Sequence, residues 1–259
     1  MFKQKRIMIK GAGDLATGVA ARLWRSGFSV AMTEIAQPLT VRRTVSLSDA
    51  IYEGETTVED LTARRVDNTD ETLKALDDGV IPVCVDPGTG IVREITPFAL
   101  IDAIMAKKNI GTSMDDAPFV VGLGPGFTAG EDVHAVVETK RGHTLGRVLW
   151  QGSAIPNTGV PGEVKGFGEQ RVIRSPGSGI FRGAVPIGTH VKAGDVVAHV
   201  GEEPVLAPIS GMLRGLLHDG VRVEKGLKSG DVDPGITGIT AGPSLTRPSP
   251  SGAGCWRLS

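Results

Sequence analysis

The sequence predicts an α/β fold in which a parallel sheet with helices is followed by a smaller, β-rich module that contains an internal duplication. Two observations support this prediction. A short apolar run, a glycine turn, a helical pattern and a second apolar run follow one another from Ile7 to Glu34, which is the order of a strand–helix–strand unit. Further on, two stretches between Arg174 and Gly226 align without a gap, and each consists of short β-type runs separated by turns.

Composition limits the classes of function. A chain of 259 residues, 40% hydrophobic and 22% charged, can bury a substantial core. Its net charge of -1 argues against a nucleic acid or an anionic membrane as partner. No apolar run approaches the roughly 20 residues that span a bilayer, and the N-terminus lacks a signal-peptide core, so we expect a cytoplasmic protein. Because Cys84 and Cys255 have no cysteine or histidine pattern around them, we expect neither a disulfide framework nor a metal site.

The glycine turn after the first apolar run matches a phosphate-binding pattern. Ile7–Ile9 read as a strand, and the helical pattern that follows ends at Gly27. Gly11, Gly13 and Ala16 fit the form G-x-G-x-x-G/A, in which the first glycine makes the tight turn, the second lets a pyrophosphate approach the backbone, and the small third residue packs the helix closely. The backbone N–H groups at the start of the helix would face the anion. These features predict a Rossmann-like nucleotide-binding sheet.

Glu34 is the acidic residue that this pattern requires. It lies about 20 residues beyond the glycines at the end of the next strand, where a carboxylate accepts from ribose hydroxyls and repels a 2′-phosphate. NAD or a related nucleotide is therefore the expected cofactor, although Arg42 and Arg43 lie close enough in sequence to weaken the preference over NADP. Asp14 leaves an alternative open, because a carboxylate at the helix start would compete with a phosphate for the same N–H groups. The turn could then bind another ligand or none.

A second glycine loop follows in the segment "FVVGLGPGFTAGEDVHAVVET". An apolar strand enters a loop that carries Gly124 and Gly126, and loops at strand ends in such sheets are where ligands bind. No Lys-Ser/Thr pair follows these glycines, so the loop is not a P-loop. Asp132 and His134 are candidate catalytic residues, with a helix-cap acid and an ordinary strand histidine as the alternative. The run "TPFALIDAIMAKKN" before this segment predicts an amphipathic helix that begins at Thr96.

His143 is the third candidate catalytic residue. It lies between Arg141 and Arg147, and this combination could hold an anionic ligand. The alternative is an exposed hairpin tip, because glycine beside charged residues is typical turn chemistry.

The duplication in the second half predicts a β module. The aligned pairs include Pro176 with Pro208, Gly179 with Gly211, Gly183 with Gly215, Val191 with Val223 and Gly194 with Gly226. Two half-modules of this kind would each cover the other's apolar face. This half resembles the biotinyl/lipoyl carrier and barrel-sandwich-hybrid fold. The carriers present a modified lysine between the halves, whereas the corresponding connection here, "AHVGEEPVLAP", has none. We therefore expect no biotin or lipoate attachment, and a structural or docking role.

Taken in order, the motifs resemble one family, the selenium-dependent molybdenum hydroxylase accessory proteins of the YqeB family. The resemblance rests on "KGAGDLATGVAARLWRSGF", "AIYEG", "GLGPGFTAGEDVHAVVETKRGHTLGRV", "NTGVPGE" and "KGLKSGDVDP". It implies a role in the maturation of selenium-dependent molybdenum hydroxylases, which would be the partner enzymes. It also implies that the N-terminal part is similar to the nucleotide-binding domain of XdhC maturation factors, and that the nucleotide-like part of the molybdenum cofactor is a second possible ligand.

Three classes of function follow from the sequence, and whether the chain is an enzyme stays open. The first is an accessory factor that binds a dinucleotide or nucleotide-like cofactor and acts on an immature hydroxylase. The residues expected to form one wall of its site are Gly11, Gly13, Asp14 and Glu34, and those that could face it are Gly124, Gly126, Asp132, His134 and His143. The second is a non-catalytic scaffold that docks a partner hydroxylase. The third is a free-standing NAD-dependent oxidoreductase, which lacks support because Tyr52 is the only tyrosine and no Tyr-x-x-x-Lys pair is present.

The predicted domains are residues 1–165 for the nucleotide-binding part, 166–234 for the duplicated module and 235–259 for a Pro/Gly/Ser-rich tail that we expect to be disordered. The family pattern would continue after "DVDP" into an apolar, glycine-containing segment. We hypothesise that a frameshift between Asp233 and Thr237 replaced that segment, because "PSGAGCWRLS" can be back-translated into such a sequence in another frame. Resequencing the gene tests this, and an intact reading frame would disprove it.

Overall fold

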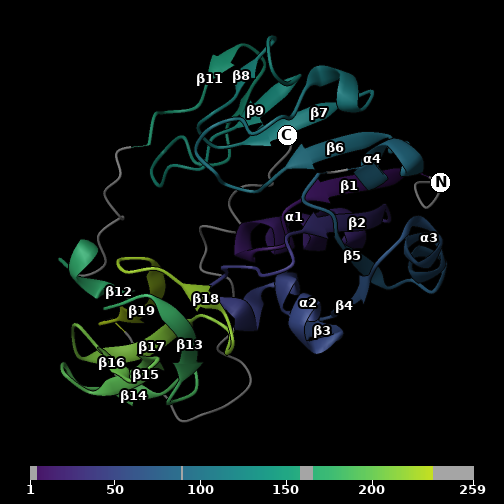
Figure 1. The fold of residues 1–259 in the computed structure, drawn as a ribbon. Helices are drawn as coiled ribbons and strands as arrows, with labels where there is room; N and C mark the ends of the chain where they lie inside the picture. Colours follow the sequence, from purple (N-terminus) through teal and green to yellow (C-terminus); the bar gives the residue numbers. More distant parts are fainter. Residues whose placement is uncertain (1–4, 89, 158–165, 236–259) are drawn as a thin grey trace. The chain divides into compact units, whose positions relative to one another are not determined.

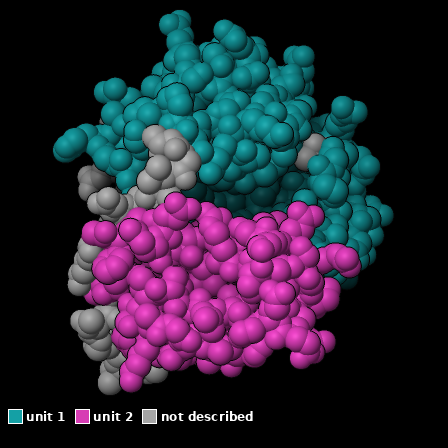
Figure 2. Space-filling view, turned by 60° about the vertical axis from the view of Figure 1, so that its left-hand side comes forward, with its two compact units in different colours: residues 1–38, 45–158, 248–259 teal, residues 39–44, 159–247 magenta. Residues whose placement is uncertain are grey.

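The structure, a computed structural model, describes residues 5–88, 90–157 and 166–235. The chain divides into two compact units, coloured separately in Figure 2. The first contains Met1–Pro38 and Val45–Thr158, and the second contains Leu39–Thr44 and Gly159–Arg247. A short segment of the N-terminal half therefore belongs to the second unit. The tail predicted to be disordered lies outside the described residues from residue 236 onward.

Within the described residues, the first unit contains a nine-stranded sheet with the order β10-β9-β7-β6-β1-β2-β5-β4-β3 (Figure 1). Its strands are β1 (Arg6–Lys10), β2 (Ser29–Glu34), β3 (Glu55–Val58), β4 (Leu61–Val66), β5 (Ile81–Val85), β6 (Ala99–Asp102), β7 (Val120–Leu123), β9 (Ala135–Val137) and β10 (Val148–Leu149). A small ribbon pairs β8 (Thr128–Ala129) with β11 (Gly152–Ser153).

The helices of this unit are α1 (Asp14–Arg25), α2 (Ala50–Glu53), α3 (Thr69–Asp77) and α4 (Gly90–Ile95), with short 3-10 turns η2 (Leu47–Asp49) and η3 (Met114–Asp116). A further turn, η1 (Arg43–Val45), lies where the chain returns from the segment of the second unit. None of the helices in the described ranges is long and apolar enough to cross a membrane.

The predicted Rossmann-like parallel sheet is wrong, because the sheet is mixed. The strands from β9 to β4 run parallel to one another, but both edge strands are antiparallel: β10 pairs with β9, and β3 pairs with β4. Glu59 and Asp60 alone join β3 to β4, and so short a connection can only return the chain antiparallel. In addition, the described connections from β6 to β7 and from β7 to β9 contain no α-helix.

The helix predicted from Thr96 is also wrong. Residues Ala99–Asp102 form strand β6, buried along its whole length between β1 and β7, and the helix in this region is the preceding α4. Thr96 itself has a φ of 47°, which does not continue a helix. A central strand buried on both faces is apolar throughout, so its sequence pattern cannot be told from that of a buried helix.

The two faces of this sheet bury separate core clusters. Along β1, Ile7 and Ile9 belong to one cluster, whereas Met8 belongs to the other, as the alternation of a strand requires. Helices α1 and α2 contribute to the first cluster, and α3 and α4 contribute to the second. Polar residues at the carboxyl ends of the strands therefore lie just beyond a core that fixes the position of their backbone.

The second unit contains two four-stranded antiparallel sheets, with the orders β12-β19-β17-β14 and β16-β15-β13-β18. The strands are β12 (Val172–Arg174), β13 (Gly179–Gly183), β14 (His190–Val191), β15 (Val196–Val200), β16 (Glu203–Leu206), β17 (Gly211–Leu216), β18 (Arg222–Val223) and β19 (Lys228–Asp233), after a 3-10 turn η4 (Glu169–Arg171). The two sheets correspond strand by strand in these orders: β12 matches β16, β19 matches β15, β17 matches β13 and β14 matches β18.

The predicted biotinyl/lipoyl-like barrel-sandwich hybrid is wrong for this unit. That prediction assumed that each half of the repeat is covered only by its twin. Instead, a segment from outside the repeat pairs with β17: the Leu216 N–H donates to the Val41 carbonyl oxygen at 2.7 Å, and Arg42 forms a parallel bridge with Leu216. The pairing of β17 with β19 shifts register between Leu213 and Gly215, whereas β13 pairs with β15 without a shift. The two halves are therefore not equivalent.

Gly215 and its aligned twin Gly183 provide a test of this asymmetry. A Cβ at Gly215 would lie 2.9 Å from the Val41 carbonyl oxygen, whereas one at Gly183 would meet only side-chain ends at 3.2 Å or more. Gly215→Ala is expected to lower the free energy of unfolding by about 1–3 kcal/mol, and Gly183→Ala by less, as measured by urea titration. Equal losses in the two variants would contradict the close approach of the 39–44 segment.

Candidate functional site

The glycine turn that follows β1 is tightly constrained. Gly11 has a φ of 88°, in the left-handed region that favours glycine. A Cβ at this position would lie 3.1 Å from the Ala103 carbonyl oxygen and 3.2 Å from the Ile104 backbone. The Gly11 N–H donates to the Thr33 carbonyl oxygen at 2.8 Å. Glycine suits this position, because a side chain would be strained at this φ and would crowd the backbone of Ala103 and Ile104.

The turn leads directly into α1. Gly13 is the N-cap of this helix, in an extended conformation, and supplies no side-chain cap to the first-turn N–H groups. Asp14 is the first helical residue, and Ala16 is fully buried against the sheet. Gly11 and Gly13 therefore lie in the turn and Ala16 in the first turn of the helix, as the sequence pattern predicts. The positive end of the helix dipole lies at the same turn.

Glu34, at the end of β2, fastens the turn from the side. Its Oε2 accepts from the Ala12 N–H at 2.9 Å, and its Oε1 accepts from the Ile35 N–H at 2.8 Å. Burial raises the pKa of this carboxyl group, and the two N–H donors oppose that rise only in part. Each carboxylate oxygen still has a second lone pair with which it can accept from a ligand hydroxyl.

The 3-10 turn η2 supports the same region, whereas the Tyr52 hydroxyl donates to the Pro38 carbonyl oxygen at 2.8 Å. The Ser48 N–H donates to the Ala12 carbonyl oxygen at 2.8 Å, and the Leu47 N–H donates to the Thr17 hydroxyl at 2.9 Å. Burial, with the negative charges of Asp49 and Glu34, raises the pKa of Tyr52 to about 12, so its hydroxyl stays protonated at neutral pH. The backbone of the turn is therefore held on several sides.

The second pair of predicted glycines lies at the same edge of the sheet. Gly124 follows β7 with a φ of 75°, and a Cβ there would meet the Thr139 Oγ1 at 2.5 Å and the Met105 Cε at 3.3 Å. A Cβ at Gly126 would lie 2.6 Å from the Lys108 backbone. The loop between β6 and β7 thus contacts Gly124 and Gly126, and through Ala103 and Ile104 it also contacts Gly11.

Asp132 and His134 do not join this group. The Asp132 Oδ2 accepts from the Thr128 N–H at 2.8 Å, and the His134 Nδ1 accepts from the Val120 N–H at 3.0 Å. Val120 begins β7, whereas the glycines follow its carboxyl end, roughly 13 Å away at the rise of a four-residue strand. In the structure both side chains accept from local backbone N–H groups; Asp132 caps no helix, because the chain continues into β9 (Ala135–Val137), and His134 precedes that strand.

His143 lies in the hairpin between β9 and β10, which begins at the carboxyl edge of the sheet. His143, Arg141 and Arg147 are all exposed. Hydrogen bonds from the Leu145 N–H to the Gly142 carbonyl oxygen and from the Arg147 N–H to the Thr144 carbonyl oxygen form successive turns around it. This is the geometry of an exposed hairpin tip.

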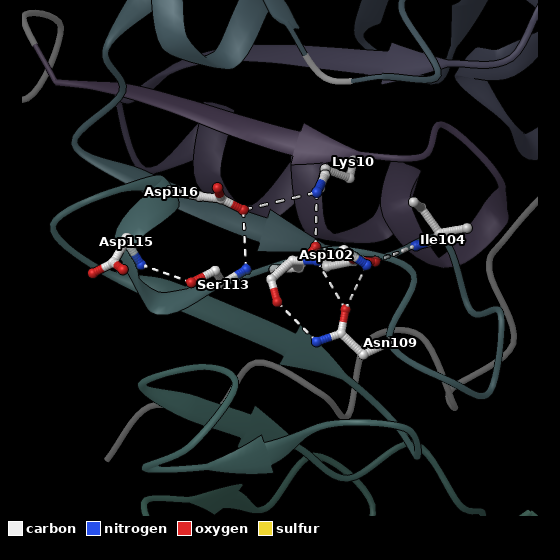
Figure 3. Close-up of polar contacts among 9 residues, drawn as sticks. Lys10, Asp102, Ile104, Asn109, Ser113, Asp115 and Asp116 are labelled. Carbon is white, nitrogen blue, oxygen red and sulfur yellow. Dashed lines mark hydrogen bonds and ion pairs between the residues drawn. The ribbon is translucent and has the colours of Figure 1, made fainter.

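Sequence reasoning missed a buried polar cluster at the ends of β1 and β6 (Figure 3). Lys10 and Asp102 are register partners, 4% and 2% exposed, and both contact the Thr112 hydroxyl. The available signal was the position of a lysine and an aspartate at the ends of the apolar runs "IMIK" and "ALID". Among the described residues, no group of three His, Cys, Asp or Glu side chains could hold a metal ion.

Comparison with known proteins places this chain beside a longer relative. It is 50% identical over 228 residues to the uncharacterized protein YqeB of Escherichia coli (strain K12), which fits the YqeB-family resemblance. The alignment covers 88% of this chain but 42% of that protein, so the chain spans about two-fifths of the length of the curated relative it matches. No protein-family model matches the chain. These findings give no support to the XdhC-like and biotinyl/lipoyl-like assignments of the two halves.

Two solved structures show a remote likeness to this chain. An aspartoacylase family protein from Mesorhizobium loti has 11% sequence identity and a TM-score of 0.28, and a succinylglutamate desuccinylase from Silicibacter sp. has 15% and 0.25. Each comparison covers 88% of this chain and 84% of the other. The TM-scores are too low to establish a shared fold, so neither the fold nor an activity of this chain is inferred from them.

Glu34 is expected to give the protein a measurable pH dependence. Because its pKa is raised in the folded state, its contribution to stability is full below the ordinary glutamate pKa of about 4.3 and is lost as pH rises through the folded value. The difference in free energy of unfolding between Glu34→Gln and the native chain should therefore shift in favour of the variant as pH rises from about 4 to 7. Altered hydrogen bonds add an offset to this difference that does not depend on pH. A difference that stays flat, or that falls with pH, would contradict the burial of this charge.

Proposed function

We propose that the chain is a YqeB-family accessory factor that binds a nucleotide-type ligand at the glycine turn and acts in the maturation of a selenium-dependent molybdenum hydroxylase. The observation that carries the binding proposal is the turn itself: left-handed Gly11, the side-chain-free N-cap Gly13 and the start of α1 lie together, with Glu34 fixed beside them. A phosphate at this position would meet backbone N–H groups and the positive end of the helix dipole.

The place of the turn in the sheet supports the same proposal. The chain runs from β1 to β2 on one side and later returns to β6 on the other side of β1, so the strand order reverses at β1. In open α/β sheets, ligands bind beyond the carboxyl ends of the strands at this kind of reversal. The strands at this reversal, β6, β1 and β2, are parallel, and the antiparallel pairs lie at the two edges of the sheet.

Glu34 supports a choice among nucleotides. The free lone pairs of its carboxylate can accept from ribose hydroxyls, whereas its charge would repel a 2′-phosphate. NAD, or the nucleotide-like part of the molybdenum cofactor, therefore fits better than NADP. The hydroxylase partner rests on the family resemblance and on the similarity to YqeB over two-fifths of that protein's length.

The binding proposal is tested by calorimetric titration of NAD, NADP and AMP into the native chain, Gly13→Val and the control Gly18→Ala. The extended φ of -66° at Gly13 suits any residue, so valine tests space and not backbone strain. A Cβ at Gly18, in the same helix, meets nothing within 4 Å. We expect saturable binding of NAD and AMP, at least about tenfold weaker binding of NADP, loss of binding in Gly13→Val and retention in Gly18→Ala. If the native chain binds none of the three, the nucleotide proposal is wrong, and a docking scaffold becomes the better interpretation.

A further inference from the structure

The first part of the connection between β6 and β7, residues 103–112, is a loop with an unusual backbone. Met105 and Lys107 have φ values of 62° and 64°, in the left-handed region that non-glycine residues rarely adopt. Such conformations persist only where the surrounding structure over-determines them, and they concentrate at functional sites. The loop must therefore be held by contacts strong enough to offset the strain.

A buried hydrogen-bond relay supplies those contacts (Figure 3). The Lys10 Nζ donates to the Thr112 Oγ1 at 2.7 Å, and the Thr112 Oγ1 donates to the Asp102 Oδ2 at 2.6 Å. An ammonium group cannot accept and a carboxylate cannot donate, so the Thr112 hydroxyl must accept from Lys10 and donate to Asp102. The other oxygen of Asp102, Oδ1, accepts from the Ile104 N–H at 3.1 Å. The relay therefore fastens both ends of the loop to the ends of β1 and β6.

A second set of contacts shapes the end of the loop. The Asn109 Oδ1 accepts from the N–H groups of Gly111 and Thr112, and its Nδ2 donates to the Thr112 carbonyl oxygen. The Asp116 carboxylate lies 4.0 Å from the Lys10 Nζ and accepts from the Ser113 N–H. Thr112 is thus fixed through its backbone and its side chain at once.

The same loop lies close to three glycines of the candidate site, Gly11, Gly124 and Gly126, where a Cβ would meet loop atoms. Its first residues pack against Gly11, the Met105 side chain lies near Gly124, and the Lys108 backbone lies against Gly126. Ile104 and Ile110 are exposed on it. A movement of the loop would therefore change the surroundings of the glycine turn directly.

We propose that Lys10, Thr112 and Asp102 are positioning residues that form a latch, which holds loop 103–112 against the glycine turn and controls entry of the ligand. The control of entry rests on the proposed nucleotide site, whereas the latch itself does not. Release of the Thr112 hydroxyl frees the loop from Lys10 and Asp102 and lets Met105 and Lys107 relax. The loop then opens more often, and a bound nucleotide exchanges faster.

The test compares Thr112→Val, which keeps the shape but removes the hydroxyl, with Thr112→Ser, which keeps the hydroxyl. Amide hydrogen exchange of residues 103–112 should become at least about tenfold faster in Thr112→Val, because a hydrogen bond to charged groups is lost, and should stay near native in Thr112→Ser. Exchange in the strands far from the latch, β4 and β5, separates local opening from general destabilisation. Unchanged loop exchange in Thr112→Val, or an equal acceleration in β4 and β5, would overturn the latch.

Stopped-flow measurement of NAD dissociation tests the control of entry. We expect NAD to dissociate at least about fivefold faster from Thr112→Val than from the native chain, with Thr112→Ser close to native. If the native chain binds NAD and both variants release it at the native rate, the loop does not control entry. If the native chain binds no nucleotide, the proposed function fails and the control of entry fails with it, while hydrogen exchange still decides the latch.

Discussion

The absence of a side chain at Gly11 is the constraint on which the packing of loops at the carboxyl ends of the parallel strands depends. Because no Cβ is present, the backbone that follows β6 can pass within van der Waals contact of the turn that follows β1. Glu34, at the end of β2, then fixes the turn, and the Lys10–Thr112–Asp102 relay fastens the neighbouring loop to the ends of β1 and β6. The N-terminus of α1 therefore lies at a turn whose position these contacts fix. Preorganisation of this kind lowers the entropy cost of binding.

The two ends of the parallel strands have different roles. At the carboxyl ends, acidic side chains accept from backbone N–H groups of loops, as the half-buried Glu34 and the buried Asp102 do. At the amino ends, His134 accepts from the first strand residue of β7 and its ring lies beside Phe119. The first arrangement leaves a helix start and glycines next to a loop, whereas the second completes backbone hydrogen bonds. The proposed nucleotide site therefore includes Gly13 and Glu34 at the carboxyl ends and does not include Asp132 or His134.

The second unit shows how a repeat loses its symmetry. Arg214 lies at the register shift of β17, where its side chain contacts Asp231 and Asp233, and Asp231 also binds the buried Arg171. The twin strand β13 pairs regularly and has no such shift. The irregular side of the unit is also the side on which Val41 pairs with Leu216. A bulge in one copy of a duplicated strand is thus associated with a contact that the other copy cannot make.

The sequence by itself determined the local features of this protein. The strand, glycine turn, helix and acidic residue from Ile7 to Glu34 lie where their pattern predicts, because dihedral preference and apolar periodicity act over a few residues. Tertiary structure decided the rest. The β6 strand was mistaken for a helix because burial on both faces erases periodicity, and the antiparallel edges depend on which strands become neighbours. The Lys10–Thr112–Asp102 relay and the pairing of Val41 with Leu216 join residues far apart in the chain, and no local pattern encodes such contacts.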